Sequence, residues 1–369
     1  MTRQHANRIA PDIAATRAAS KGRGAGSNPA NRFEAQSYEV DGDWLDTLDE
    51  EPAPETVVIS DASKSILVRN DSPDVGFDVG LNPYRGCEHG CVYCYARPSH
   101  EYLGFSAGLD FETRILVKEN AAALLRAELS KPKWEPETIT MSGNTDCYQP
   151  LEKRLRLTRG CLEVLAEFRN PVAIITKNRL VTRDIDLLGA LASHEACAVF
   201  VSVTTLDVGL NRKLEPRSSL PRQRLDAIRA LSAAGIPTGV MVAPVIPGLT
   251  DHEIPAILEA AAEAGATRAG KVVLRLPHAV APLFEEWLER HYPLRKNKVL
   301  ERVRAMRGGK LNDPRFGNRM RGEGIFAEQI SALFRAGCKR HGLTTGRIPL
   351  STEAFRRVHD KRGQMGLFE

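Results

Sequence analysis

The sequence predicts an α/β protein built on a partial (β/α)6 barrel of the TIM type, with a disordered N-terminus and a basic helical C-terminal extension. Three observations lead to this prediction. Six short apolar runs rich in Val, Ile and Thr alternate with longer helical stretches. These runs are almost continuously apolar, as is typical of parallel strands covered by helices. Gly235 and Gly265 stand where two of the helices should end. An open doubly wound sheet is the alternative arrangement.

Four regions follow along the chain of 369 residues. Residues 1–64 are expected to be disordered, because they are rich in Ala, Arg, Gly, Pro and acids and lack apolar periodicity. The barrel should span 65–281, the basic helical extension 282–348 and a flexible tail 349–369. The expected strands are 77–83, 138–143, 172–177, 198–205, 238–245 and 271–276. The expected helices between them are 120–129, 157–168, 184–193, 221–235 and 254–265.

The extension is expected to contain one helix over 285–309, a Gly/Arg loop over 315–324 and a second helix over 325–342. Between residues 295 and 347 there are 14 Lys and Arg against 4 Asp and Glu. Such a basic block suits a polyanion such as nucleic acid, and Arg315, Arg319 and Arg321 could contact its phosphates. A solvated face that keeps the protein soluble explains the charge equally well.

Cysteine usage and hydropathy indicate a cytoplasmic protein without membrane contact. The first 20 residues contain no apolar core of a secretory signal, and no apolar run is long enough to cross a bilayer. Three of the seven cysteines lie within eight residues. In a reducing compartment, clustered thiols bind metal or perform chemistry rather than form disulfides.

Cys87, Cys91 and Cys94 have the spacing C-x3-C-x2-C within the segment NPYRGCEHGCVYCYARP. Three thiolates in one loop can hold three irons of a [4Fe–4S] cluster and leave the fourth iron open to a cosubstrate. The loop follows the first expected strand, at the barrel edge where active sites lie. Zinc is the alternative, with His89 or His100 as a fourth ligand.

This spacing, with the aromatic Tyr93 just before Cys94, resembles the signature of the radical S-adenosylmethionine (SAM) superfamily. The resemblance implies that the methionyl amine and carboxylate of SAM chelate the open iron. It also implies that the reduced cluster cleaves SAM to methionine and a 5′-deoxyadenosyl radical, which abstracts a hydrogen atom from substrate. A flavodoxin or ferredoxin is the expected electron donor.

The segments SGNTDCYQPLEKRLRLTR (142–159), ITKN, VSVTT, LEPR and APVIPGLTD look like the spore photoproduct lyase-related branch, often described as DNA repair photolyases. This resemblance, which covers about residues 65–345, favours radical repair or modification of nucleic acid, with DNA as the preferred substrate. The alternatives are radical modification of RNA, a peptide or a small molecule. A non-catalytic module that binds zinc or nucleic acid is the alternative from another class.

The resemblance suggests SAM-binding positions at the ends of the strands. Lys177 could pair with the SAM carboxylate, or be a surface lysine. Ser202 and Thr204 could bind the ribose or methionyl group, or satisfy backbone groups. Glu215 and Arg217 could clamp SAM or substrate, or form a local salt bridge.

Three further positions follow strands of the expected barrel. Asn144 and Asp146 lie where the superfamily often has a Gly-Glu pair for the SAM amine, so this contact departs from the family pattern. Pro244, in APVIPG, lies where the superfamily places the adenine; a tight turn is the alternative. Cys147 could return a hydrogen atom to a product radical, as a cysteine near this point does in spore photoproduct lyase. Packing is favoured for Cys147, because free Cys often behaves as a small hydrophobe.

The last residues contain Gln364, Met365, Gly366, Leu367 and Phe368. This string resembles the short peptide with which bacterial repair and replication proteins dock on the β sliding clamp. Two adjacent large apolar residues in a polar tail could fill pockets of such a partner. Chance occurrence of a five-residue pattern is the alternative.

Overall fold

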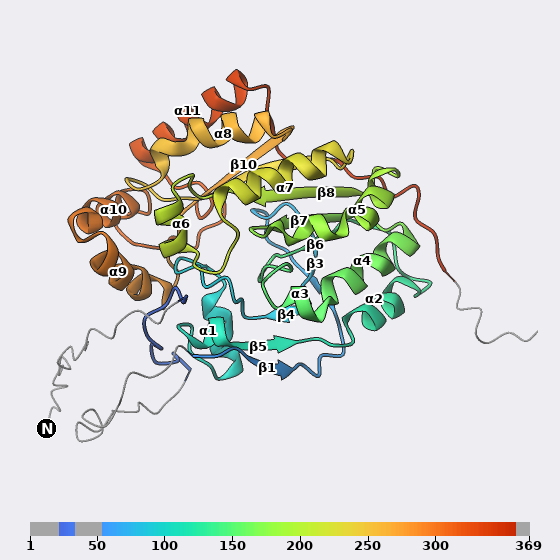
Figure 1. The fold of residues 1–369 in the computed structure, drawn as a ribbon. Helices are drawn as coiled ribbons and strands as arrows, with labels where there is room; N and C mark the ends of the chain where they lie inside the picture. The colour runs from blue at the N-terminus through green and yellow to red at the C-terminus, as the bar shows by residue number, and fades with distance from the viewer. Residues whose placement is uncertain (1–21, 34–53, 359–369) are drawn as a thin grey trace, which may run out of the picture.

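The computed structural model describes residues 22–33 and 54–358, and a helix-covered sheet dominates it (Figure 1). The sheet has eight strands in the spatial order β11-β10-β9-β8-β7-β6-β3-β2. Six of these strands form its central part, and each is parallel to its neighbours among the six. They are β3 (Val79–Leu81), β6 (Ile139–Met141), β7 (Val172–Thr176), β8 (Cys197–Ser202), β9 (Thr238–Val245) and β10 (Arg268–Val273). This consecutive order confirms the partial barrel, because a doubly wound sheet would reverse its order at one point.

Two short strands that the sequence analysis missed extend the sheet at its edges. The strand β2 (Leu67–Arg69) pairs antiparallel with β3, and β11 (Thr344–Thr345) pairs parallel with β10. Both have partly or fully exposed side chains, so they lack the continuous apolar character that marks the six central strands.

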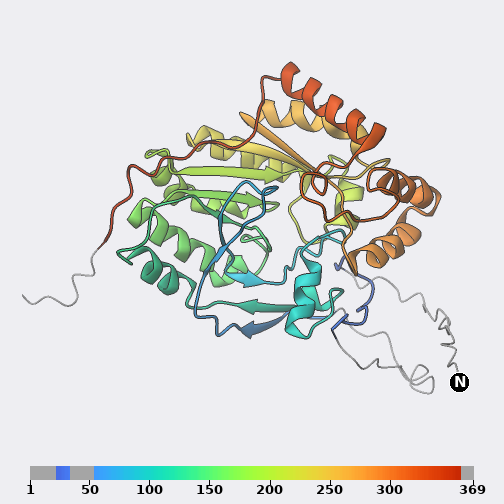
Figure 2. The same ribbon diagram turned by 180° about the vertical axis from the view of Figure 1, so that it is seen from behind.

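The helices have the following bounds: α1 (Asp110–Thr113), α2 (Ala121–Leu129), α3 (Glu152–Leu155), α4 (Leu157–Phe168), α5 (Ile185–Ala192), α6 (Val208–Leu214), α7 (Pro221–Ala233), α8 (Ile254–Glu263), α9 (Val280–His291), α10 (Pro293–Ala305) and α11 (Gly324–Arg340). The described residues also form the 3-10 helices η2 (Arg97–Leu103), η3 (Arg179–Asp184) and η4 (Asp251–Glu253). Helices α2, α4, α5, α7 and α8 lie on one side of the sheet, and the view from behind shows the strands in front of them (Figures 1 and 2).

The five helices expected between the strands are confirmed as α2, α4, α5, α7 and α8. Helix α4 buries Cys161, Leu162, Leu165 and Phe168, whose spacing places them on one helical face toward the sheet. Gly235 follows α7 with a φ of 75°, the left-handed conformation that a helix end requires and that glycine adopts without strain.

The prediction of a single helix over 285–309 is wrong, because the chain forms α9 and α10 instead. The break falls at Tyr292-Pro293, where Tyr292 has a non-helical φ of −145° and ψ of 53°. Proline lacks the amide proton that a continuous helix would use and disfavours the helical conformation of the preceding residue. The second expected helix is present as α11, which packs on α8.

The expectation of a disordered segment over 1–64 also needs correction for the residues that the structure describes. Residues 22–33, which we call the N-terminal strap, are tied to the barrel by hydrogen bonds rather than by an apolar face, so periodicity could not reveal them. The strand β1 (Val57–Ser60) joins β5 (Arg114–Val117) and β4 (Tyr84–Arg85) in a second sheet of order β1-β5-β4. Residues 1–21 and 34–53 lie outside the described residues.

Residues 349–358, the described part of the expected flexible tail, contact the helical layer of the barrel. The ring of Phe355 packs at a tilt against that of Phe168 in α4, and the Arg356 amide donates to the Phe168 carbonyl at 2.9 Å. Residues 349–358 therefore lie along the helical layer, and the clamp-like string at 364–368 lies outside the described residues. Within 22–33 and 54–358, we find no helix that is both long and apolar enough to cross a membrane.

Candidate active site

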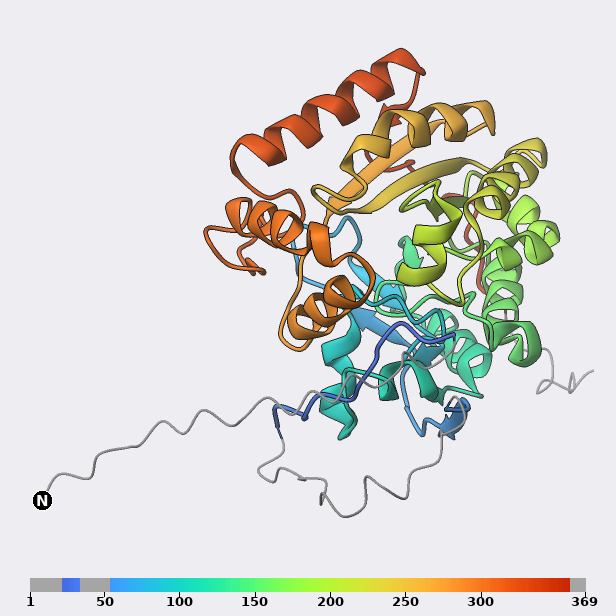
Figure 3. The same ribbon diagram turned by 60° about the vertical axis from the view of Figure 1, so that its left-hand side comes forward.

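The three motif cysteines lie in the loop after β3 and β4, at the carboxyl edge of the parallel strands. Helix α6, which follows β8, and helices α9 and α10, which follow β10, gather at the same edge (Figure 3). Cys87 and Cys91 are buried, Cys94 is partly exposed, and all three thiols are free. Because parallel strands present their carboxyl ends together, this edge also collects most of the other residues proposed from the sequence.

Backbone hydrogen bonds fix the cysteine loop from two directions. The Cys87 amide donates to the Phe111 carbonyl at 2.9 Å, and the Val92 amide donates to the Leu214 carbonyl at 3.1 Å. The first bond attaches the loop to α1 and the second attaches it to α6. The loop is therefore held by structure on both sides of its thiols.

A buried ion pair lies beneath this loop, and the sequence analysis missed it. Arg97 and Glu112 form the pair, and both side chains are 0% exposed. The Arg97 guanidinium also donates to the Cys91 carbonyl at 2.9 Å and to the Gly108 carbonyl at 2.9 Å. Buried charges are costly unless they are paired and fully hydrogen-bonded, and this pair meets that condition.

The N-terminal strap covers the outer side of the same loop. The amides of Gly24 and Ala25 donate to the two carboxylate oxygens of Glu112, at 3.0 and 2.8 Å. Gly24 approaches Gly90 so closely that a Cβ at position 24 would overlap the Gly90 carbonyl oxygen. Only glycine fits at this contact. Because Glu112 binds both the strap amides and Arg97, it connects the strap to the cysteine loop.

Burial raises the pKa of all three thiols above the ordinary value. For Cys91, burial and the Glu215 carboxylate raise the pKa, and the Lys177 ammonium opposes them. For Cys94, Arg97 and Lys177 are among the groups that oppose the effect of burial. A free thiolate is costly in this buried environment, because its negative charge is removed from water. A metal that binds the thiolates would compensate that charge, so this environment favours metal-bound over free thiolate.

Tyr93 and Thr204 meet Glu215 in a buried cluster beside Cys91. The Tyr93 hydroxyl and the Thr204 hydroxyl both donate to Glu215, the latter at 2.7 Å, and Arg224 forms an ion pair with the same carboxylate. Burial alone would raise the pKa of Glu215, but Arg224, Lys177 and the two hydroxyls together lower it to about 2. Glu215 is therefore ionised, and it is paired with Arg224 rather than with Arg217.

Lys177 and Asp146 meet at the ends of neighbouring strands. The Lys177 amide donates to Asp146 at 2.8 Å, and its ammonium donates to the Ala243 carbonyl at 3.3 Å. His89 Nδ1 lies 3.4 Å from the Asp146 carboxylate. Burial would raise the pKa of Asp146, but His89, the Lys177 amide and the Thr176 hydroxyl lower it to about 2. The ammonium of Lys177 is thus held in the space between the cysteine loop and β9.

Other residues proposed from the sequence lie near this edge without joining the cluster. Asn144 is exposed, and its amide donates to the Asn82 side chain at 3.2 Å. Arg217 forms an ion pair with Glu88 at 3.1 Å, so its charge is already balanced. Ser202 is buried, and its carbonyl accepts a 2.9 Å bond from Arg224.

Pro244 follows Ala243, whose carbonyl accepts a hydrogen bond from Lys177 and lies 3.0 Å from the Thr204 hydroxyl oxygen. Cys147 is 0% exposed within the main hydrophobic core, and burial raises its pKa well above the ordinary value. The main core includes Leu81, Met141 and Leu162, so Cys147 packs as a small apolar side chain would.

His89 and His100, considered above as zinc ligands, have other partners. His89 contacts Asp146 and Asn178. His100 Nε2 lies 2.9 Å from the Arg114 carbonyl, and burial lowers the pKa of His100 to about 4. Within the described residues, we find no group of three or more His, Cys, Asp or Glu arranged to hold a single metal ion. A cubane differs from a single ion, because each cysteine binds its own iron.

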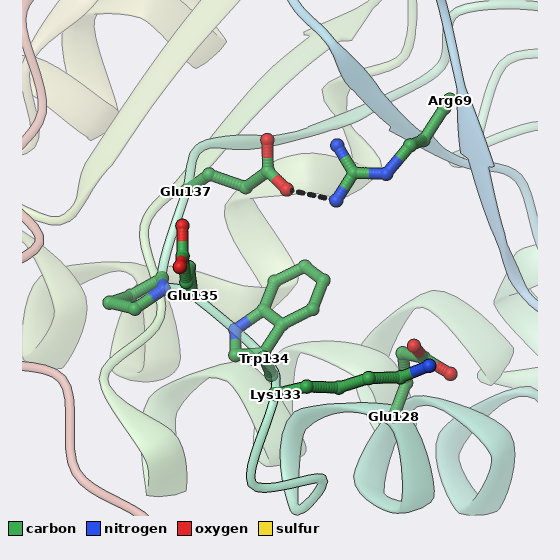
Figure 4. A pocket seen from close by; sticks show the side chains of 7 residues that line it. Arg69, Glu128, Lys133, Trp134, Glu135 and Glu137 are labelled. Carbon is green, nitrogen blue, oxygen red and sulfur yellow. Dashed lines mark hydrogen bonds and ion pairs between the residues drawn. The ribbon is translucent and has the colours of Figure 1, made fainter.

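A separate pocket lies at the opposite edge of the sheet (Figure 4). It is lined by Arg69, Glu128, Lys133, Trp134, Glu135, Pro136 and Glu137. Arg69 is in register with Val79, the first residue of β3, whereas the cysteine loop follows the end of that strand. Arg69 and Glu137 form an ion pair at 2.7 Å across the pocket, and we assign it no part in the chemistry.

Comparison with known proteins finds similarity over the residues that form this edge. Residues 81–261 match the model of the Radical SAM superfamily. An uncharacterized protein of Mycobacterium tuberculosis is 42% identical over 219 residues, 59% of this chain and 64% of that protein. A radical SAM Nalpha-GlyT isomerase of a Pseudomonas phage is 29% identical over 176 residues, 46% of this chain and 34% of that protein.

Spore photoproduct lyase, solved in complex with dinucleoside spore photoproduct, has the same fold. The TM-score is 0.53 with 16% identity, over 78% of this chain and 81% of the lyase. A variant of that lyase, solved with bound AdoMet and dinucleoside spore photoproduct, gives the same TM-score of 0.53 at 16% identity, over 80% of this chain and 82% of the variant. The chain spans 64% of the length of the mycobacterial relatives, so their match concerns part of each protein.

Proposed function

We propose that this chain, which carries a radical SAM domain, is an enzyme that cleaves S-adenosylmethionine reductively in order to repair or modify nucleic acid, with DNA as the substrate. The observation that carries the proposal is the loop of Cys87, Cys91 and Cys94 at the carboxyl edge of a partial barrel, with the Lys177 ammonium beside it. The fold shared with spore photoproduct lyase, which was solved with a dinucleoside lesion, supports DNA over the alternatives.

The residues of the loop fit a [4Fe–4S] cluster. Three free thiols stand in one loop, two buried and one partly exposed, and an ammonium and a guanidinium offset the charge that their ionisation would create. Three ligands leave one iron open, as binding of a cosubstrate requires. When bound, the cluster and SAM together supply the 5′-deoxyadenosyl radical that abstracts a hydrogen atom from substrate.

The chain's own residues would position SAM through charge and hydrogen bonding. Lys177 presents an ammonium to the space between the cysteine loop and β9, where it can pair with a carboxylate. The ionised Glu215 is 1% exposed, and Arg224 and Tyr93 already bind its carboxylate, so it would act on the same ligand through its charge and by holding Tyr93 in place. Asp146 holds the backbone of Lys177 and thereby the start of its side chain.

Anaerobic incubation with SAM, a reductant and UV-damaged DNA tests the proposal. The reconstituted wild-type protein should form 5′-deoxyadenosine, and the amount of lesion should fall. Cys91→Ala should form none, whereas Cys197→Ala, which removes a buried thiol in β8, should retain activity. Absence of SAM cleavage by the iron-loaded wild type would refute radical catalysis. Cleavage that leaves damaged and undamaged DNA unchanged would refute the DNA substrate and favour RNA, a peptide or a small molecule.

Metal content separates the enzyme from a zinc-binding module. Protein purified without oxygen should contain about four irons per chain and be brown. Stoichiometric zinc in place of iron would contradict the proposal. A flavodoxin or ferredoxin is the proposed source of electrons, and either should replace the chemical reductant in the assay.

Docking on a sliding clamp is a further part of the proposal, and it concerns residues outside the described part of the chain. Leu367 and Phe368 would supply the two apolar anchors of the docking peptide, with Gln364 and Met365 before them. Replacement of Leu367 and Phe368 by Ala should abolish binding to the clamp. Binding that survives both replacements would remove this partner.

A further inference from the structure

Arg275 is a partly buried cation without an ion-pair partner at the mouth of the barrel. It follows β10, and within the described residues no carboxylate lies within ion-pair distance of its guanidinium. Burial, together with the nearby Arg319, lowers the pKa of Arg275, whereas Tyr95, Cys94 and Asp74 act in the opposite direction. A partly desolvated guanidinium that lacks a paired carboxylate is a favourable partner for an anion such as a backbone phosphate.

The guanidinium of Arg275 lies over the ring of Tyr95, 4.5 Å from the ring centroid. Tyr95 directly follows Cys94, and its hydroxyl donates to the Gly143 carbonyl at 2.5 Å. The ring is held at its hydroxyl and stacked by Arg275, yet the residue is 47% exposed. An exposed aromatic ring in a fixed orientation is a platform on which a base can stack.

A second arginine–aromatic stack stands next to the first. Arg319 lies over the ring of Phe316, 4.7 Å from its centroid, and Phe316 is 61% exposed. Asp74 holds this part of the loop, because it accepts from the Gly317 amide at 2.6 Å and pairs with Arg319 at 2.6 Å. Asp74 therefore pairs directly with Arg319, and Arg275, which has no ion pair among the described residues, is the arginine of the two that can pair with an added anion.

From these contacts we propose that Tyr95, Arg275, Phe316 and Arg319 form a substrate subsite that binds a single-stranded or extruded nucleotide. Arg275 takes a backbone phosphate, and a base adjoining that phosphate stacks on Tyr95. Alternating aromatic and cationic side chains are the means by which proteins hold single-stranded nucleic acid. The inference rests on the proposed nucleic-acid function and specifies where, beside Cys94, the substrate strand lies.

Binding of a fluorescent single-stranded oligodeoxynucleotide to the reconstituted full chain tests the subsite. Tyr95→Ala should weaken binding about 5- to 100-fold, the range expected for loss of one base stack. Arg275→Gln should weaken binding and lower the slope of log affinity against log salt by about one. The double variant should lose less than the product of the single losses, because both residues contact the same nucleotide.

Matched controls stand elsewhere on the surface. Tyr102 is 72% exposed and contacts the ring of Phe33 in the strap at a tilt, and Arg340 is exposed at the end of α11. Tyr102→Ala should bind the oligonucleotide as the wild type does, and Arg340→Gln should lose no more than a general charge effect. Equal losses for Arg275→Gln and Arg340→Gln would overturn the subsite in favour of diffuse attraction by the basic region.

Three outcomes relate this inference to the proposed function. SAM affinity should be similar in the wild type and Arg275→Gln, and a large loss of SAM affinity would place Arg275 in the SAM site and overturn the subsite. If the wild type binds and modifies DNA while Tyr95→Ala and Arg275→Gln bind it normally, the subsite is wrong and the function stands. If the wild type binds no nucleic acid, both fail. Circular dichroism and iron content establish that each variant is folded and loaded.

Discussion

Replacement of Glu112 by Gln would test whether the buried Arg97–Glu112 pair supports the cysteine loop. Gln has nearly the same shape as Glu and retains one carbonyl oxygen to accept from the strap amides. It removes the negative charge that compensates Arg97, and both side chains are 0% exposed. The substitution therefore leaves a buried guanidinium without its counter-charge, and it also replaces one accepting oxygen by an NH2 group that faces another donor.

The expected cost is about 3 to 5 kcal/mol in the free energy of unfolding, the usual range for removing one partner of a buried ion pair. Because Arg97 also donates to the Cys91 carbonyl, movement of its guanidinium should displace the loop that carries the thiols. We therefore expect Glu112→Gln to lose stability and to retain less iron than the wild type.

Denaturant unfolding of the metal-free protein measures the first effect, and iron per chain after reconstitution measures the second. The matched control is Glu137→Gln, which breaks the Arg69–Glu137 pair, whose side chains are 73% and 28% exposed. An exposed pair contributes at most about 1 kcal/mol, because water and salt screen it. A cost below about 1 kcal/mol for Glu112→Gln, together with unchanged iron content, would refute a supporting role for the buried pair.

Three further substitutions or conditions give separate predictions. Gly24→Ala should reduce iron content, because the new methyl group would meet the Gly90 carbonyl. The control Gly189→Ala lies in α5 with open space around it and should stabilise the protein by about 0.5 to 1 kcal/mol. Equal iron contents in Gly24→Ala and the wild type would contradict the first expectation. Burial lowers the pKa of His100 to about 4 from 6.5, so the contribution of a neutral His100 is present above pH 6.5 and is lost as pH falls toward 4. Over this pH range the free energy of unfolding should fall by about 3 kcal/mol more in the wild type than in His100→Gln, as measured by urea unfolding at each pH. Parallel pH profiles of the two proteins would exclude this effect. Lys177→Met should weaken SAM binding about tenfold or more, because a charged hydrogen bond to the ligand is lost. Equilibrium dialysis with the iron-loaded protein measures the affinity, and undiminished affinity would exclude that contact.

Local periodicity was sufficient to predict the barrel. The strands β7 and β9 and the helices α4 and α7 are each defined by residues close together in sequence, so their apolar patterns, with Gly235 after α7, locate them. The same reasoning failed where a single residue decides. Pro293 separates α9 from α10 although the helical pattern continues across it, and Tyr292 takes the non-helical conformation.

The site could be predicted only as far as its residues are neighbours in sequence. Cys87, Cys91 and Cys94 are recognisable by their spacing. The partner of Glu215 is Arg224 rather than Arg217, two residues away, because the helical register of α7 brings Arg224 to the carboxylate. Contacts of this kind join distant segments, and no spacing rule in one sequence specifies them.

Removal of the first 64 residues, at the boundary that composition suggests, would delete far more than a linker. The strap reaches both ends of the cysteine edge: Asn31 donates to the Glu101 carbonyl at 2.9 Å, and Ser27 donates to Glu286 of α9 at 3.1 Å. A recombinant fragment that begins at residue 65 would expose Glu112 and the back of the loop to solvent and oxygen. The smallest fragment suitable for anaerobic biochemistry therefore begins before Arg23, well upstream of the first barrel strand.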